Sequence, residues 1–137
     1  MSTSRYLNLG IDHGTTNSAI AYMSDKGPTV VSHGVLDIMP SAVFYDKAGR
    51  RYVGLEARNM MRMTEEKDGE GHDGYKLLMG QDERYAFRAA RKVHSPIELG
   101  GFVLGELLAS YTKLNGTTPH GCVITIPAKF DDAQREA

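Results

Sequence analysis

The 137-residue sequence has a single cysteine, no run of about 18 apolar residues and almost no net charge. One cysteine, Cys122, cannot form a disulfide within the chain, which indicates a reducing, intracellular environment. Without a long apolar run there is neither a candidate membrane span nor a signal-peptide hydrophobic region, so we expect a soluble, cytoplasmic protein. A net charge of −1, with scattered Lys and Arg, gives no reason to expect nucleic-acid or membrane binding.

The five histidines lie far apart, with no pair at i and i+4, so we do not expect a zinc site. Apolar residues make up 41% of the sequence, which is enough to build the core of one compact domain.

Alternating apolar and polar residues at the start of the chain are typical of β-strands. This alternation marks the first strand, and two further segments separated by a turn at residues 25–28 complete a predicted antiparallel meander of three strands, over residues 5–12, 19–23 and 29–32. A hairpin is predicted over residues 42–45 and 51–53, followed by a short helix over residues 55–63. Residues 65–74 (EEKDGEGHDG) offer nothing to bury and are expected to form a mobile loop.

The clearest helix begins after Ser95, because a Ser N-cap, Pro96 and Glu98 together form a capping-box start. Gly116 provides its left-handed stop. Its apolar stripe comprises Ile97, Leu104, Leu107, Leu108, Tyr111 and Leu114. Three glycines within the helix predict close approach to a sheet, at Gly100, Gly101 and Gly105. The apolar run at 121–126 predicts a buried central strand, and a further helix is expected with Asp131 as its N-cap.

Residues 9–18 (LGIDHGTTNS) form the most informative stretch, in which an apolar strand ends at a carboxylate beside a Gly-Thr-Thr-Asn turn. Backbone N–H groups of such a turn can form a nest for an anion, and a nearby carboxylate can hold a hydrated Mg²⁺. The chemistry suggested is nucleoside-triphosphate binding. An ordinary hairpin turn has the same composition, so the stretch alone leaves both interpretations open.

A second stretch, residues 122–137 (CVITIPAKFDDAQREA), decides between them. Together the two stretches resemble the ATPase domain of the seventy-kilodalton heat-shock chaperones of the DnaK type. Their order and separation suit the first lobe of that domain. Weaker matches lie between them, at residues 76–80 (KLLMG) and at the helix that opens with Ser95.

The resemblance implies an α/β fold, that of a ribonuclease-H-like lobe of an actin-like ATPase, here truncated, with a mixed sheet and an inserted small α+β subdomain. The whole chain, 1–137, would be a partial nucleotide-binding domain. Residues 1–34 and 95–137 would form its core sheet and helix, and residues 35–94 the inserted subdomain. The expected helix near the C-terminus has only about two turns, which indicates a fragment of a longer protein.

The resemblance also implies roles for particular residues, with ATP or ADP and Mg as cofactors. Asp12 would be catalytic and would contact the metal through water, and Lys76 would reach the γ-phosphate and the attacking water. Backbone donors of the turn would hold the phosphates, at Gly14, Thr15, Thr16 and Asn17. An interdomain relay would use Pro127 and Arg135.

Several positions depart from the pattern of the family. His13 stands where the family usually has an apolar residue, and we expect a hydrogen-bonded imidazole with no direct role. Leu77 and Gln81 replace residues that tend to be basic, which lowers the local charge. Lys129 and Asp131 replace an aromatic residue and an asparagine, which bears on the interdomain relay more than on the fold.

The function implied is that of a DnaK-type molecular chaperone, in which Mg-ATP binding and hydrolysis are coupled to peptide binding. Its partners in full length would be peptide clients, a J-domain co-chaperone and a nucleotide-exchange factor. Two alternatives use the same superfold: an actin-like filament protein, and a sugar or acetate kinase. The chain has no second glycine-rich phosphate loop, so we expect the fragment alone to be inactive. An exposed sheet edge would favour its self-association.

Overall fold

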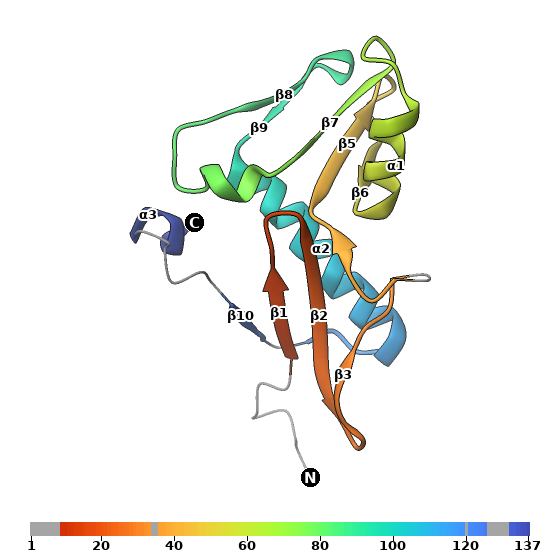
Figure 1. The fold of residues 1–137 in the computed structure, drawn as a ribbon, viewed down its shortest axis with the longest axis vertical. Coiled ribbons are helices and arrows are strands. Elements are labelled where there is room, and N and C mark those ends of the chain that lie inside the picture. The colour runs from red at the N-terminus through yellow and green to blue at the C-terminus, as the bar shows by residue number, and fades with distance from the viewer. Residues whose placement is uncertain (1–8, 34–35, 120, 126–131) are drawn as a thin grey trace.

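The computed structural model describes residues 9–33, 36–119, 121–125 and 132–137. A mixed sheet is formed by the N-terminal strands β1 (Leu9–His13), β2 (Asn17–Ser24) and β3 (Gly27–Val30), which pair antiparallel in sequence order. The short strand β4 (Met39–Pro40) also pairs with β2, and β10 (Val123–Thr125) lies parallel to β1 (Figure 1). The three-stranded meander and the mixed sheet are therefore confirmed within the described residues.

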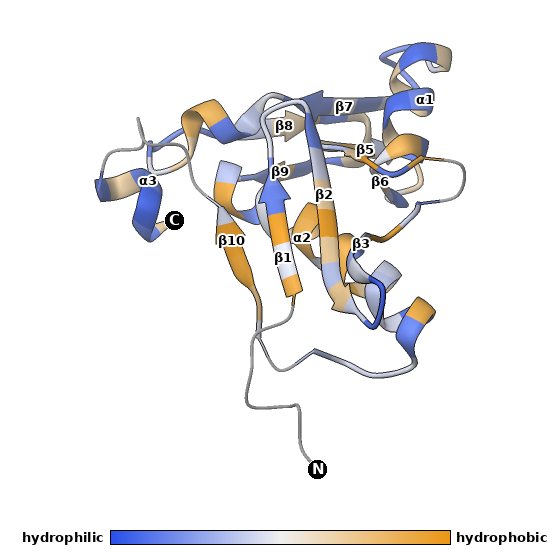
Figure 2. Cartoon of the chain, turned by 60° about the horizontal axis from the view of Figure 1, so that its bottom comes forward, coloured by the Kyte–Doolittle hydropathy of each residue, from blue (hydrophilic) through white to orange (hydrophobic). Residues whose placement is uncertain are grey.

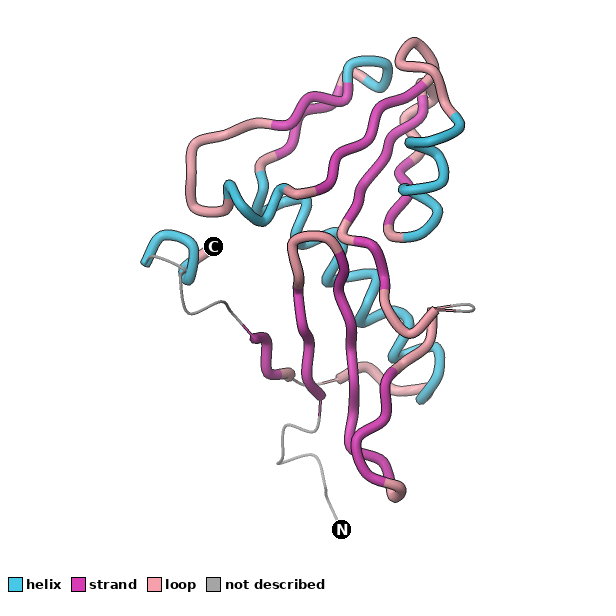
Figure 3. The backbone as a smooth tube through the Cα atoms, viewed as in Figure 1, coloured by secondary structure: helices cyan, strands magenta, loops and turns pink. Residues whose placement is uncertain are grey.

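The long helix α2 (Pro96–Asn115) crosses behind this sheet (Figure 3). Ser95 caps it, with both reciprocal bonds of a capping box to Glu98, and Gly116 ends it in the left-handed conformation with φ 74°. Both predicted ends are thus confirmed. Such a capped start satisfies backbone donors that the first helical turn cannot satisfy itself.

The buried face of α2 differs from the predicted stripe. It is an i, i+4 row made by Leu99, Val103, Leu107 and Tyr111. Ile97 and Leu114 are 47% and 59% exposed, so their assignment to the core was wrong. Gly100 belongs to this face: a Cβ there would lie 2.4 Å from Met79 Cε and 3.3 Å from His13 Cε1, so a larger residue would require the Met79 side chain to shift. Gly101 and Gly105 have no such neighbour among the described residues, and the nearest neighbour of Gly100 lies after η1, so the predicted approach to a sheet is limited to the contact of Gly100 with His13 of β1.

A second sheet lies beyond α2, built from β5 (Ala42–Asp46), β6 (Arg51–Val53) and β7 (Gly69–Asp73) in the order β6-β5-β7. The helix α1 (Leu55–Met63) packs against it, so the predicted hairpin and short helix are confirmed. Beside it lies the hairpin of β8 (Tyr85–Phe87) and β9 (Lys92–His94). Two short 3₁₀ helices complete this part, η1 (Tyr75–Leu78) and η2 (Arg88–Ala90).

The expectation of a mobile loop over residues 65–74 was wrong for residues 69–73, because β7 pairs along the whole of β5. The segment adds main-chain hydrogen bonds instead of apolar side chains. Gly69 is buried directly against Phe44, and a Cβ there would lie 2.3 Å from the Phe44 ring. A count of apolar side chains does not detect this strand, because Gly69 contributes to the packing by leaving room for the Phe44 ring.

The expected strand near residue 123 exists as β10, but it is not buried. Val123 is 53% exposed and Ile124 is 42% exposed, and β10 forms the edge of its sheet. The apolar colour of β10 in Figure 2 therefore marks an open surface. A parallel strand is usually covered on both faces, which explains why the sequence predicted a central position.

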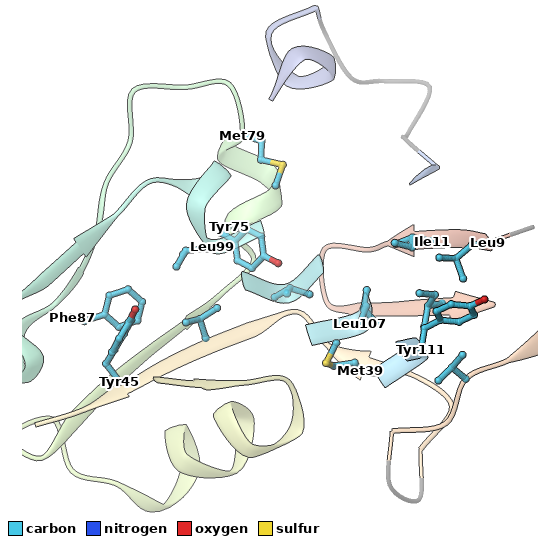
Figure 4. Packing of buried hydrophobic residues seen from close by; sticks show 14 residues of the cluster. Leu9, Ile11, Met39, Tyr45, Tyr75, Met79, Phe87, Leu99, Leu107 and Tyr111 are labelled. Carbon is cyan, nitrogen blue, oxygen red and sulfur yellow. The ribbon is translucent and has the colours of Figure 1, made fainter. Parts of the chain in front are cut away.

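One apolar core runs through both sheets (Figure 4). Leu9, Ile11 and Tyr111 lie at one end of it, and Tyr45 and Phe87 lie at the other. The proposed division into residues 1–34 with 95–137 and an inserted 35–94 stays a prediction. No helix in the described part of the chain is long and apolar enough to cross a bilayer.

Candidate functional site

Asp12 lies at the end of β1, between two neighbouring strands. It pairs with Ala19 of β2 on one side and with Thr125 of β10 on the other. The Thr125 hydroxyl lies 3.3 Å from Asp12 Oδ1 and 3.4 Å from the carbonyl oxygen of Ile11, and it can donate to either. The Asp12 side chain is exposed, so a hydrated cation can approach it.

The turn after Asp12 is held by hydrogen bonds to Ser41, which is fully buried. The Ser41 hydroxyl donates to the carbonyl oxygen of Gly14 at 2.8 Å, and its backbone N–H donates to the carbonyl oxygen of Thr16 at 2.9 Å. Ser18 Oγ lies 2.8 Å from Ser41 Oγ and, with that proton already used, acts as the donor. Two carbonyl dipoles, which repel anions, are therefore held on the inner side of the turn.

Gly14 is required by the shape of this turn. A Cβ at this position would lie 2.2 Å from the carbonyl oxygen of Asn17, so no other residue fits without movement of the backbone. The side-chain Oδ1 of Asn17 is buried, and none of the residues that the structure describes bonds to it. A buried acceptor of this kind is costly, and it marks the turn as a place where local stability is not maximised.

Lys76 comes to the same place from η1, 64 positions along the chain from Asp12. The 3₁₀ turn starts after Gly74, which has the left-handed φ of 65°. Lys76 is only 5% exposed, and this burial lowers the pKa of its ammonium while the Asp12 carboxylate opposes the shift. The structure thus brings the two predicted catalytic residues within electrostatic reach of each other.

His13 and Tyr75 join these two segments. His13 Nε2 lies 2.8 Å from the Tyr75 hydroxyl, and both side chains are buried. Burial, with a further contribution from Lys76, lowers the pKa of His13 to about 4, although Asp12 opposes this. Burial also raises the pKa of the Tyr75 phenol. Both groups are therefore neutral at pH 7.

The sequence did not reveal Ser18, Ser41 or Tyr75 as parts of this arrangement. Serine in a strand and tyrosine beside a lysine are common, and the contacts span 23 to 62 residues of sequence. Among neighbouring residues, only the position of Tyr75 directly before Lys76 could have indicated that this tyrosine belongs to the site. His13 was expected to be a hydrogen-bonded imidazole, and it is one.

A hollow of about 480 Å³ opens beside Lys76, a size suited to a small ligand. Its polar lining includes His13, Lys76, Thr125 and Arg135. Its apolar walls come from α2, η1 and β10, at Met79, Ile97, Leu104 and Ile124. Asp12 is bonded to one lining residue, Thr125, and interacts with another, Lys76.

Arg135 reaches the hollow from α3 (Asp132–Glu136), which packs closely against the turn after η1. A Cβ on Gly80 would lie 2.7 Å from the backbone of Ala133, so these two segments touch. Pro127, the other predicted relay residue, lies outside the described residues, as do Lys129 and Asp131. The predicted relay of Pro127 and Arg135 therefore stays a prediction.

A larger hollow, of about 690 Å³, lies between α2 and β6. Its lining includes Arg51, Phe102 and Lys113. Asp12 and Lys76 do not line it, so size alone does not identify the site. The described residues also bring no three His, Cys, Asp or Glu side chains together as a metal cluster.

The sequence profile of the Hsp70 protein family matches residues 8–137. The chain belongs to the Hsp70 family. It is 35% identical to the chaperone protein DnaK of Thermotoga neapolitana over 139 residues, which cover all of this chain and 22% of that protein. It is 32% identical to an HscA homologue of Acidithiobacillus ferrooxidans, over 97% of this chain and 24% of the relative.

A mitochondrial 70 kDa heat-shock protein of Solanum tuberosum is 30% identical, over 94% of this chain and 22% of its own length. The chain therefore spans less than a quarter of the length of these relatives. It corresponds to the N-terminal part of the Hsp70 ATPase domain. The Hsp70 family implies an actin-like ATPase fold, and the mixed sheet with its crossing helix agrees with that fold.

Proposed function

We propose that this chain forms one wall of a Mg-ATP site in a DnaK-type chaperone ATPase. The observation that carries the proposal is the meeting of Asp12 and the buried Lys76 beside a turn whose carbonyls are held inward by Ser41. Catalysis of phosphoryl transfer consists mainly of positioning and charge stabilisation. A fixed cation, a carboxylate and an anion-binding turn supply these functions.

Each residue has a distinct part in this proposal. The backbone donors of residues 14–17 would bind phosphate oxygens, and the Lys76 ammonium would neutralise charge that develops there. Asp12 would hold Mg²⁺ through water. The residues present fit such an ion, because Mg²⁺ keeps several waters and takes only one or two carboxylates together with phosphate oxygens. When bound, the ion supplies charge neutralisation between the phosphates.

The finer fold and the partners belong to the same proposal. The chain would be a ribonuclease-H-like lobe with a small subdomain inserted at residues 35–94. Peptide clients, a J-domain co-chaperone and a nucleotide-exchange factor would act on the full-length protein, with Pro127 and Arg135 in the interdomain relay. A cytoplasmic location is part of the proposal, although some relatives are named as mitochondrial. The isolated chain would not hydrolyse ATP and would self-associate through β10.

A chimera tests the proposal. Residues 8–137 replace the matching segment of the Thermotoga DnaK, and ATP binding and single-turnover hydrolysis are measured. We expect hydrolysis in the chimera and a loss of about 10²-fold in Lys76→Ala. Lys26→Ala, at an exposed turn, is the matched control and should leave the rate unchanged. A folded chimera that binds no ATP would contradict the proposal. An ATP hydrolysis rate that Lys76→Ala leaves unchanged would also contradict it.

A further inference from the structure

The hydrogen bond between His13 and Tyr75 connects the two chain segments that carry the charged residues of the site. His13 follows Asp12 directly, and Tyr75 directly precedes Lys76. Their side chains meet at 2.8 Å across 62 residues of sequence, with ring centroids 5.7 Å apart. A single contact thus ties the end of β1 to the start of η1.

We propose that His13 and Tyr75 form a positioning pair that sets where Lys76 lies relative to Asp12 and the turn of residues 14–17. This inference rests on the proposed function, because it assigns the pair a purpose in phosphoryl transfer. Neither side chain contacts the reacting atoms. Each acts through its charged neighbour in the chain.

The pair is well protected from water. His13 is 4% exposed and Tyr75 is fully buried. Helix α2 covers both: a Cβ on Gly100 would lie 3.3 Å from His13 Cε1 and 3.7 Å from Tyr75 Cε2. In such a place water cannot replace a lost partner, so either group would remain unsatisfied if the other were removed.

The segment that carries Lys76 needs an external anchor. η1 is a single 3₁₀ turn of four residues between Gly74 and Met79. Such turns have poorer hydrogen-bond geometry than α-helices and are used in short pieces. Tyr75 supplies the anchor, since in Figure 4 its phenol points toward the turn that joins β1 and β2.

The anchor also reaches the anion-binding turn. Ser41, which bonds to Gly14 and Thr16, lies close enough to the Tyr75 phenol to lower its pKa against the effect of burial. The imidazole and the phenol are both uncharged at pH 7, so the pair adds no charge beside bound phosphate. The pair therefore acts by fixing the position of Lys76 relative to Asp12 and the turn. Catalysis by positioning depends strongly on such geometry.

The first experiment uses the 137-residue chain without nucleotide. An acylating reagent labels lysines, and mass spectrometry gives the rate at Lys76 against the rates at Lys26, Lys47 and Lys113 in the same molecule. Tyr75→Phe removes one oxygen and keeps the ring. We expect the Lys76 rate to rise about three- to tenfold, the range that one net hydrogen bond supports, while the surface lysines stay unchanged.

Tyr85→Phe is the matched control, with the same atom removed from a half-buried tyrosine of β8, and should leave Lys76 unchanged. His13→Leu should reproduce the effect of Tyr75→Phe. The double variant should give no more than either single variant, because the two side chains act as one unit. An unchanged labelling rate at Lys76 in folded Tyr75→Phe would overturn the inference. So would a double variant in which the rate increases of the two single variants multiply.

If Tyr75→Phe raised the rates of all lysines together, unfolding would be the cause, and His13→Gln would then decide. Its amide can still bond to the phenol, so a normal Lys76 rate in His13→Gln beside a raised rate in His13→Leu supports the pair. Equal rates in these two variants refute it. In the Thermotoga chimera, Tyr75→Phe should lower kcat about tenfold with KM changed less than twofold.

The two proposals fail separately. The labelling assay contains no ATP, so its outcome does not depend on nucleotide binding. If Lys76→Ala left the ATP hydrolysis rate of the chimera unchanged, the ATPase role would be refuted and the anchoring of Lys76 would not. If Tyr75→Phe left the labelling rate at Lys76 unchanged, the positioning role of the pair would be refuted and the ATPase role would not.

Discussion

The hydroxyl of Ser41 donates a 2.8 Å hydrogen bond to the carbonyl oxygen of Gly14, 27 residues earlier in the chain. The backbone N–H of Ser41 donates to Thr16 in the same turn. Ser41 lies between β4 and β5, outside the hairpin that contains the turn. The shape of the turn after Asp12 thus depends on a residue that the local sequence of the turn does not contain.

Replacing this serine tests that dependence. Ser41→Ala leaves the Gly14 carbonyl and the Ser18 hydroxyl without their shared partner in a buried place, so we expect a loss of about 1–3 kcal/mol in the free energy of unfolding. Urea denaturation measures it. Ser32→Ala is the control, because that hydroxyl bonds to Asp37 at an exposed site and its loss should cost less than about 0.5 kcal/mol. Equal effects of the two substitutions would contradict the role given to Ser41.

The glycines of α2 should respond in opposite directions. Gly100→Ala places a methyl group 2.4 Å from Met79 Cε, the flexible end of a side chain that must shift, and 3.3 Å from His13 Cε1, and we expect it to destabilise the chain by about 1 kcal/mol through overpacking. Gly105→Ala meets no atom within 4 Å and should stabilise the chain by up to about 1 kcal/mol through helix propensity. Thermal unfolding of both variants compares them. A stabilised Gly100→Ala would contradict the close packing of Gly100 against Met79 and His13.

Gly69 offers a similar test in a strand. Gly69→Ala would place a Cβ 2.3 Å from the Phe44 ring and 2.9 Å from the carbonyl oxygen of Tyr45, so we expect a loss of about 1–3 kcal/mol. Gly10→Ala in β1, where no atom lies within 4 Å, is the control. Denaturation curves of the two variants should separate clearly. Similar curves would argue against the close packing of β7 on β5.

Stability should fall in mild acid because of His13. Its pKa is lowered from 6.5 to about 4 in the folded chain, so between these values the unfolded chain binds more protons. The stability contributed by the neutral imidazole is complete above pH 6.5 and is lost as the pH falls toward 4, by roughly 3 kcal/mol. Denaturation of the wild type and His13→Leu at pH 7 and pH 4.5 isolates this contribution. An identical fall in both proteins would assign the acid sensitivity to other groups.

Local sequence signals predicted the elements that are made locally. The capping box at Ser95, the stop at Gly116 and the helix α1 depend on residues a few positions apart, and all three were found where expected. The first strand of the meander follows from the alternation of apolar Leu9 and Ile11 with Gly10 and Asp12. Such patterns need no knowledge of the rest of the fold.

The errors arose where distant segments decide the outcome. β7 forms because β5 offers it a pairing edge and Phe44 covers Gly69, neither of which its own sequence reveals. β10 has the composition of a central strand but lies at an edge, since burial depends on neighbours rather than on the strand itself. The site divides in the same way: Asp12 and Lys76 were predicted through family resemblance, whereas Ser41 and Tyr75 are linked to them only by the fold.

The parallel pairing of β10 with β1 sets the order in which the chain can assemble during synthesis. Asp12 and its partner Thr125 are separated by 113 residues. At about 5–20 residues per second, a ribosome needs roughly 6–23 seconds to add Thr125 after Asp12. Once β2 has been made, the hairpin of β1 and β2 can form, while one side of β1 still has no strand beside it. The emerging segment of this Hsp70-family chain thus presents an unpaired strand edge to its surroundings before its own fold can cover it.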